Sequence, residues 1–209
     1  MSTGTKSVIE NYLISYGILD SGHTSAAAEI LLSVQPTLDV YSYSSPAKYV
    51  DLLWSKMEGH KLFNANLRGK AFELLIACAL IKAEVLPFYW QASLEFVPLA
   101  NFDLVVYTEE KGPIALSCKT SIRERYKQAE FEAQALKNVH KRAKTYLLTM
   151  ESTEASGVNH KRKEGILSCI DKVVVANRVE FNKLIEDLQS LTIIAAPIVS
   201  IVSSGNHIH

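Results

Sequence analysis

The segment FDLVVYTEEKGPIALSCK, residues 102–119, contains two apolar runs on either side of the turn-forming sequence Glu109-Glu110-Lys111-Gly112. The runs cover 102–108 and 113–119, and each has the length and the alternation of a half-buried strand. Charged residues followed by glycine favour a tight reversal of the chain. The segment therefore predicts an antiparallel β-hairpin.

The register of this hairpin decides which side chains meet. With residues 109–113 unpaired, Asp103 faces Lys119, and opposed residues project to the same face. One face is then apolar and forms a core, whereas the other face carries Asp103, Ser117 and Lys119; the apolar set is Leu104, Val106, Ile114, Leu116 and Cys118. We therefore expect a carboxylate beside an ammonium at the open end of the hairpin.

A long helix is expected over 123–141, because apolar residues recur there at helical spacing. Glu132 flanks this apolar stripe and can lean toward the strand end that carries Lys119, while Glu130 flanks the other side and is the alternative acid. Glu73, on an earlier expected helix, is a further candidate. Two or three carboxylates beside a lysine suit a Mg²⁺ site that hydrolyses phosphodiesters. The alternative is a simple surface ion pair.

The rest of the chain predicts a single domain of the α/β (α+β) class, with a helical N-terminal region over 1–60, a core over 61–192 and a C-terminal segment over 193–209. Helical patterns cover 7–19, 46–59, 66–83 and 179–188, with another helix after 24–25. Further strands are expected over 88–97, 144–150 and 169–176, which makes a mixed five-stranded sheet. A polar loop is expected over 151–164, and a last apolar strand or packing segment over 191–202.

Composition limits the classes of function. The chain has 209 residues, 22 Lys+Arg and 22 Asp+Glu, so its zero net charge excludes a uniformly basic nucleic-acid coat. No apolar run is long enough for a membrane span and no signal-peptide core is visible, so no membrane partner is expected. Three cysteines without a zinc-type spacing indicate reduced core residues in a cytoplasmic protein.

A local basic excess is nevertheless present. Residues 119–144 contain eight Lys or Arg and three Glu, which fits either a DNA cleft or a solvated helix face. Lys161 and Arg162, in the expected polar loop, are candidates for phosphate contacts, with a mobile charged loop as the alternative.

Asp103, the Ser117-Cys118-Lys119 triplet and the downstream string CKTSIRERYKQ resemble the PD-(D/E)xK nuclease superfamily. In particular they are similar to the branch of type II restriction endonucleases that reads CC/GG pairs, which includes EcoRII-, PspGI- and NgoMIV-like enzymes. That branch has a non-acidic residue where Ser117 stands and takes the missing acid from the following helix. Phe102 replaces the proline of the usual motif. The resemblance covers about a third of the chain, from Glu73 to Glu132, and implies a restriction-endonuclease-like core.

The resemblance also implies roles. Asp103 and Glu132 would bind Mg²⁺, Lys119 would be the catalytic lysine, and Glu73 would tune the metal site. The residues matching the base-reading string are Arg123, Glu124, Arg125 and Lys127. Arginine bonds bidentately to guanine, and glutamate accepts from cytosine N4, so an Arg-Glu-Arg triplet suits adjacent G·C pairs.

The expected function is Mg²⁺-dependent hydrolysis of double-stranded DNA at a short palindrome containing CC/GG. A palindromic target favours a homodimer, and restriction enzymes of prokaryotic cytoplasm act beside a companion DNA methyltransferase. Two alternatives stay open. One is a structure-specific repair or resolvase-type nuclease of the same fold, and the other is a non-catalytic DNA-binding protein.

Overall fold

The structure is a computed structural model, and it describes residues 8–19, 25–35, 45–97, 100–197 and 202–208. Its strands are β1 Phe88–Leu94, β2 Phe102–Thr108, β3 Gly112–Cys118, β4 Lys144–Thr149, β5 Lys172–Val175 and β6 Val202–Ile208. Its helices are α1 Val8–Ser15, α2 Ala26–Val34, α3 Pro46–Glu58, α4 Ala65–Lys82, α5 Arg125–Val139, α6 Ser152–Lys163 and α7 Val179–Gln189. The expected α/β class is confirmed.

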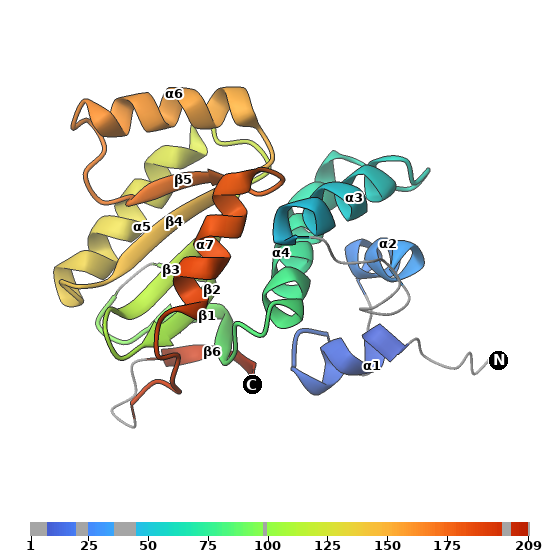
Figure 1. Ribbon diagram of the computed structural model, residues 1–209, viewed down its shortest axis with the longest axis horizontal. Helices are drawn as coiled ribbons and strands as arrows, with labels where there is room; N and C mark the ends of the chain where they lie inside the picture. Colours follow the sequence, from blue (N-terminus) through green and yellow to red (C-terminus); the bar gives the residue numbers. More distant parts are fainter. Residues whose placement is uncertain (1–7, 20–24, 36–44, 98–99, 198–201, 209) are drawn as a thin grey trace.

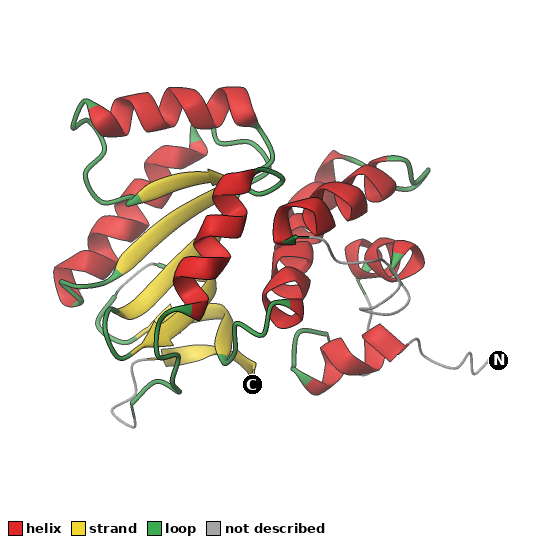
Figure 2. Ribbon diagram, viewed as in Figure 1, coloured by secondary structure: helices red, strands yellow, loops and turns green. Residues whose placement is uncertain are grey.

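The strands form one mixed sheet in the order β5-β4-β3-β2-β1-β6 (Figure 2). Strands β3, β4 and β5 are parallel, whereas β2 runs antiparallel to both β1 and β3, and β6 runs antiparallel to β1. The five expected strands are present, and β6 adds a sixth strand further along the chain than the expected 191–202. Within that range Ile193 forms a single bridge with Thr108, and residues 198–201 lie outside the described residues.

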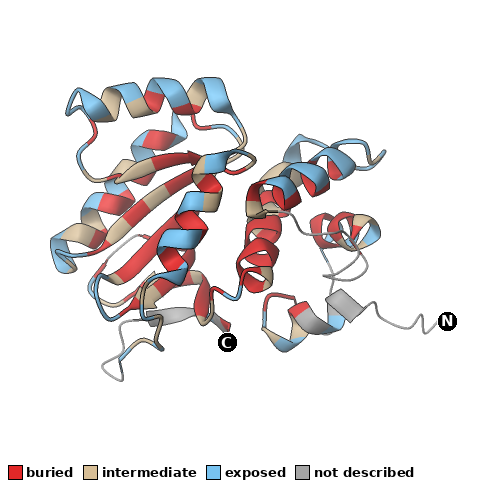
Figure 3. Ribbon diagram, viewed as in Figure 1, coloured by how far each residue is buried: buried red, intermediate tan, exposed pale blue. Residues whose placement is uncertain are grey.

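Helices pack on the sheet in layers. Figure 1 shows α5 and α7 on opposite faces of the sheet, α6 beside the β5 edge, and α1 to α4 gathered to one side. One cluster of buried apolar side chains extends from these N-terminal helices into the sheet, and its members include Leu31, Leu53, Phe72, Leu116 and Phe181. The strand interiors are accordingly buried, and the outer faces of the helices are exposed (Figure 3).

Helices α2, α3 and α4 each begin directly after a polar residue whose side chain caps the helix. The hydroxyls of Ser25 and Ser45 accept from the backbone N–H of the third residue after each, and the Asn64 carboxamide caps α4. Pro46 occupies the first turn of α3, where no N–H is needed. Among the described residues, no helix combines the length and the apolar character that crossing a membrane requires.

The expected polar loop over 151–164 is wrong, because these residues form α6. Two apolar positions one turn apart, Ala155 and Val158, are buried against the sheet and give the helix its packing face. No other residue of the helix is apolar and buried, so the apolar stripe is too thin to stand out from the sequence.

The hairpin register also differs from the expected one. Val106 pairs with Ile114 and Thr108 with Gly112, so the turn has three residues, 109–111, rather than five. Gly112 takes a positive φ of 71°, which this type of short turn requires at its last position. The shift is two residues, so the two faces keep the side chains expected for them.

Candidate active site

Asp103 and Lys119 meet where β2 begins and β3 ends. Asp103 Oδ2 accepts from the backbone N–H of Cys118 at 2.7 Å and from Lys119 Nζ at 3.0 Å. The backbone N–H of Lys119 in turn donates to the Leu148 carbonyl of β4, and this hydrogen bond fixes Lys119 beside β4. Both side chains are largely buried, at 10% and 16% exposed. The expected juxtaposition of carboxylate and ammonium is therefore present, although the register is different.

The charge of Lys119 is set by two opposing effects. Burial by itself lowers the pKa of this ammonium, but the Asp103 carboxylate and its hydrogen bond raise the pKa, and the net result lies above the usual value. Lys119 therefore remains positively charged at neutral pH. Such a group can stabilise negative charge that develops on a phosphate.

Glu132 approaches the pair from α5. It is 6% exposed, and its Oε1 accepts from Gln128 Nε2, one turn earlier on the helix, at 2.7 Å. Burial raises the pKa of the Glu132 carboxyl, and the Asp103 charge adds to the increase, while Gln128 and Lys119 oppose it. Glu132 therefore lies within electrostatic reach of both members of the pair.

Glu130 accepts hydrogen bonds from a different part of the chain, the backbone before β5. Its Oε1 accepts from the backbone N–H groups of Ser168 and Cys169, and its Oε2 accepts from that of Ile170, at 2.7 to 2.9 Å. These bonds hold the segment that leads into β5. Of the two acids that the sequence leaves open, Glu132 is the one whose charge interacts with Asp103 and Lys119.

Glu73 reaches the same region from α4. Its Oε2 accepts from Gln91 Nε2 at 2.9 Å and from Lys70 Nζ at 3.2 Å. Burial raises the pKa of Glu73, and the Asp103 charge raises it further. Gln91 sits at an irregularity in β1 with φ of 49°, a conformation that costs a residue with a side chain about 1–3 kcal/mol. The strained residue directs its amide toward the acid.

Ser117 is buried in β3, two residues before Lys119 and on the same face of the strand. Ser117 is neutral, so it adds no carboxylate to the strand face that carries Asp103. The carboxylates that accompany Asp103 come instead from the two helices, at Glu132 and Glu73.

Asp103, Glu132 and Glu73 offer carboxylates, the kind of ligand that a hard divalent cation takes. Carboxylate oxygens are the ligands that Mg²⁺ prefers, and one or two suffice, because the ion retains several waters. Burial, and after it repulsion from the Asp103 charge, raises the pKa values of Glu132 and Glu73, and a bound cation would oppose both effects. Within the part of the chain that the structure describes, no three His, Cys, Asp or Glu side chains lie close enough together to hold a metal ion.

The residues expected to read bases form the loop before α5 and its first turn. Arg123 is 84% exposed at its side chain, and its Nε donates to Glu154 Oε1 at 2.8 Å. Glu124 pairs with Lys127 at 2.6 Å on the surface, and Arg125, the first residue of α5, is exposed. All four side chains therefore project from the protein next to Lys119.

Lys161 and Arg162, expected in a polar loop, lie in α6, and their surroundings differ. Lys161 Nζ donates to the Tyr126 hydroxyl at 2.8 Å and lies 4.4 Å from the centre of that ring, so it braces α6 against α5. Arg162 Nε reaches Asn159 Oδ1 at 3.4 Å and lines a groove on the other side of the helix.

Three residues that support the site escape the sequence reasoning. Glu154 of α6 accepts from the Ile122 backbone N–H at 2.7 Å, from Arg123 and from Ser121, and so ties α6 to the loop after Lys119. This contact spans 32 residues, so no local pattern reveals it. Gln91 is also distant from Glu73 in the sequence, by 18 residues. The four-residue spacing of Gln128 and Glu132, by contrast, is visible in the sequence.

Comparison of the chain with family models, with curated proteins and with solved structures finds no significant match.

Proposed function

We propose that this chain is a Mg²⁺-dependent nuclease that hydrolyses phosphodiester bonds of double-stranded DNA. The observation that carries the proposal is the hydrogen-bonded pair of Asp103 and Lys119 with Glu132 and Glu73 within electrostatic reach. A protein that only binds DNA has no use for buried acids beside its phosphates, because their charges repel the ligand.

In this proposal Asp103 and Glu132 hold the Mg²⁺. When bound there, the ion would supply Lewis acidity toward the phosphate and toward a water nucleophile. Lys119 remains an ammonium, and it adds positive charge where the reacting phosphate becomes more negative. Glu73, steered by Gln91 and Lys70, supports the acidic cluster from α4.

The narrower proposal is a type II restriction endonuclease that cuts a short palindrome containing CC/GG. It is supported by the resemblance of the CKTSIRERYKQ string to enzymes of that kind. It is also supported by the exposure of Arg123, Glu124 and Arg125 beside the site. Each well-formed bidentate contact gives about 1–3 kcal/mol of discrimination between bases.

Further parts of the proposal follow from the chemistry of such a target. A palindrome presents two equivalent scissile bonds, and one site per chain then calls for a homodimer. A companion DNA methyltransferase would protect the same sequence in the cytoplasm of a prokaryotic cell.

The test is a digest of unmethylated plasmid DNA by the purified protein with Mg²⁺, followed by sequencing of the cut ends. Lys119→Ala, checked for folding by circular dichroism, is the control. Discrete fragments that the variant does not produce, with ends at one CC/GG palindrome, support the full proposal. A smear supports a nuclease that reads DNA structure instead. No cleavage with Mg²⁺ or Mn²⁺ contradicts both.

A further inference from the structure

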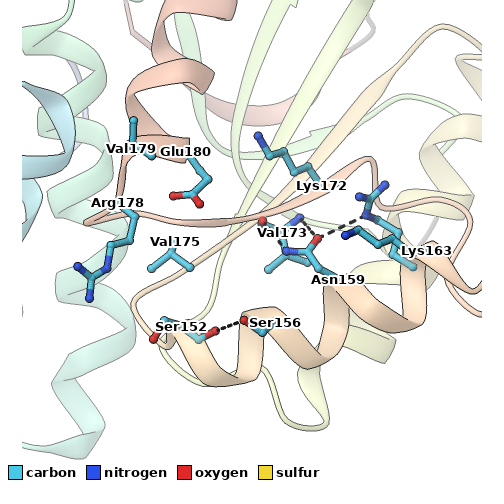
Figure 4. Close-up of a pocket in the computed structure, with 11 residues that line it drawn as sticks. Ser152, Ser156, Asn159, Lys163, Lys172, Val173, Val175, Arg178, Val179 and Glu180 are labelled. Atoms are coloured by element: carbon cyan, nitrogen blue, oxygen red, sulfur yellow. Dashed lines mark hydrogen bonds between the residues drawn. The ribbon is translucent and has the colours of Figure 1, made fainter.

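A groove with a volume of about 720 Å³ lies between α6, β5 and the start of α7 (Figure 4). Ser152, Ser156 and Asn159 of α6 form one wall, and Val173 and Val175 of β5 form the floor. This groove lies outside the cluster around Asp103, and the proposed hydrolysis does not account for it.

The groove is lined by four cations, Arg162, Lys163, Lys172 and Arg178, against one acid, Glu180. Among the described residues none of the four forms a salt bridge, although other cations of the same sheet edge, such as Arg123, do. Glu180 offsets only one of the four charges, so the groove keeps a net positive charge. An uncompensated set of this kind attracts a polyanion.

The floor of the groove is closed to a pairing strand. Strand β5 is the edge of the sheet, but the Asn159 carboxamide bonds to both the N–H and the C=O of Val173, at 3.4 and 3.1 Å (Figure 4). Because these outward backbone groups are occupied, an added β-strand has no partner at this residue. Side-chain cations and hydroxyls are the groups left for a ligand.

The cations stand at both ends of the groove. Lys172 begins β5 and Arg178 follows its end, and a strand of four residues alone spans about 10 Å. A single phosphate cannot touch both ends, whereas one DNA strand places a phosphate about every 3.4 Å along the helix axis. The spacing therefore favours a polymer of phosphates over one phosphate group.

One end of the groove lies at the same edge of the parallel strands as the candidate active site. Ser152 follows the carboxyl end of β4, Arg178 follows that of β5, and Lys119 follows that of β3, and these ends lie along one edge of the parallel strands. Glu154 of α6 bonds directly to Ile122 in the loop after Lys119. A duplex that crosses this edge at the active site would extend toward the groove.

We propose that the α6–β5–α7 groove binds the sugar-phosphate backbone of duplex DNA that flanks the cleaved position. The inference rests on the proposed function for the identity of the polymer. Phosphate contacts carry no sequence information, so the groove contributes affinity and orientation, and the contribution is equal for every sequence.

The experiment measures binding of a fluorescent 30-base-pair duplex in EDTA, where no cleavage is needed, over a series of salt concentrations. The double variant Lys163→Ala/Arg178→Ala removes two groove charges. The matched control, Lys111→Ala/Lys141→Ala, removes two exposed charges that precede β3 and β4, at the amino ends of these parallel strands. Two lost phosphate contacts reduce the slope of log K against log salt by about 1.8. The control slope stays at the wild-type value, and duplexes with and without CC/GG respond alike.

Equal slopes for the groove variant and the control would overturn the inference. So would tight binding of inorganic triphosphate that is lost in the groove variant while its DNA slope is unchanged, since the ligand would then be a small polyphosphate. Binding that depends on the groove, without any cleavage by the wild type, would uphold the groove and overturn the nuclease. If the wild type cleaves DNA but the groove charges have no effect on binding, the nuclease proposal is upheld and the groove proposal is overturned.

Discussion

Asp103 Oδ2 accepts from the Cys118 backbone N–H and from Lys119 Nζ, so one oxygen joins the edge of β3 to the ammonium that follows it. Both donors come from consecutive residues at the end of the strand. The carboxylate therefore fixes the position of Lys119 as well as compensating its charge. Because the pair is largely buried, loss of one partner leaves the other charge without compensation.

The first prediction concerns this pair. Lys119→Met is expected to lower the free energy of unfolding by about 3 kcal/mol, since it leaves the Asp103 carboxylate buried and unpaired. Asp103→Asn/Lys119→Met is expected to cost less than the sum of the two single changes, because the double variant holds no unpaired charge. Urea denaturation of the four proteins measures the coupling. Strict additivity would show that the two groups do not interact.

Glu132 gives a prediction about pH. Its pKa is raised in the folded protein, so its contribution to stability is complete below the ordinary value of 4.5 and is lost as pH rises through the folded pKa. Glu132→Gln removes this loss and keeps an oxygen that accepts from Gln128. The variant is therefore expected to melt at a higher temperature than the wild type at pH 7.5 in EDTA, and at the same temperature at low pH.

Added Mg²⁺ extends the same comparison. A ligand that binds only the folded state raises its melting temperature. Mg²⁺ should therefore stabilise the wild type more than Glu132→Gln and narrow the difference between them. A wild type that melts higher than the variant at pH 7.5 without metal would contradict the burial of an uncompensated carboxylate.

Glu130 is predicted to behave in the opposite way. In Glu130→Gln the amide nitrogen replaces one carboxylate oxygen, so it faces a backbone N–H such as that of Ile170, and both groups are donors. The cost is about 2 kcal/mol of unfolding free energy. Thermal denaturation tests this loss of stability. A variant as stable as the wild type would mean that the three hydrogen bonds from the backbone to Glu130 do not contribute to the free energy of unfolding.

The hairpin of β2 and β3 shows which features of the structure can be predicted from the sequence. Alternation alone separates Leu104 and Val106 from Asp103, because a strand has a side-chain period of two. The register slips by two residues, since the number of unpaired turn residues depends on the positive φ of Gly112, which the sequence permits but does not require. The side chains stay on their expected faces of the hairpin because a shift of two residues does not change the face to which a side chain points.

Contacts between distant segments are what the sequence does not reveal. Helix α6 is missed because its apolar face has only Ala155 and Val158, and its stability comes from packing on the sheet. Glu130 and Glu132 both flank the stripe of α5, and they are told apart only by the 168–170 backbone that folds onto Glu130. Local patterns cannot encode which distant segment arrives at a helix.

Glu154 carries a prediction about the loop that follows Lys119. Burial raises the pKa of this carboxyl, but the Ile122 and Arg123 hydrogen bonds outweigh it, and the net pKa is lowered. The stabilisation from these contacts is therefore present above pH 4.5 and is lost as pH falls through the folded pKa.

Glu154→Ala is accordingly expected to expose the Ile122 amide and to free Arg123. Hydrogen exchange at Ile122 should accelerate about tenfold, the equivalent of one hydrogen bond of about 1.4 kcal/mol. Discrimination between CC/GG and other duplexes should fall, because Arg123 is no longer oriented. Unchanged exchange at Ile122 in the variant would show that the loop is held by other groups.

The central claim is that Asp103, Glu132 and Lys119 form a Mg²⁺-dependent site for phosphodiester hydrolysis, and the most direct measurement is the rate at which supercoiled plasmid is cut. Wild type, Glu132→Gln and Glu130→Gln are compared with Mg²⁺ at a temperature where all three are folded. Loss of a metal ligand removes several kcal/mol of transition-state stabilisation, so Glu132→Gln should be slower by at least about 100-fold. Glu130→Gln should cut at the wild-type rate. Equal rates for wild type and Glu132→Gln, or no cutting by the wild type, would contradict the claim.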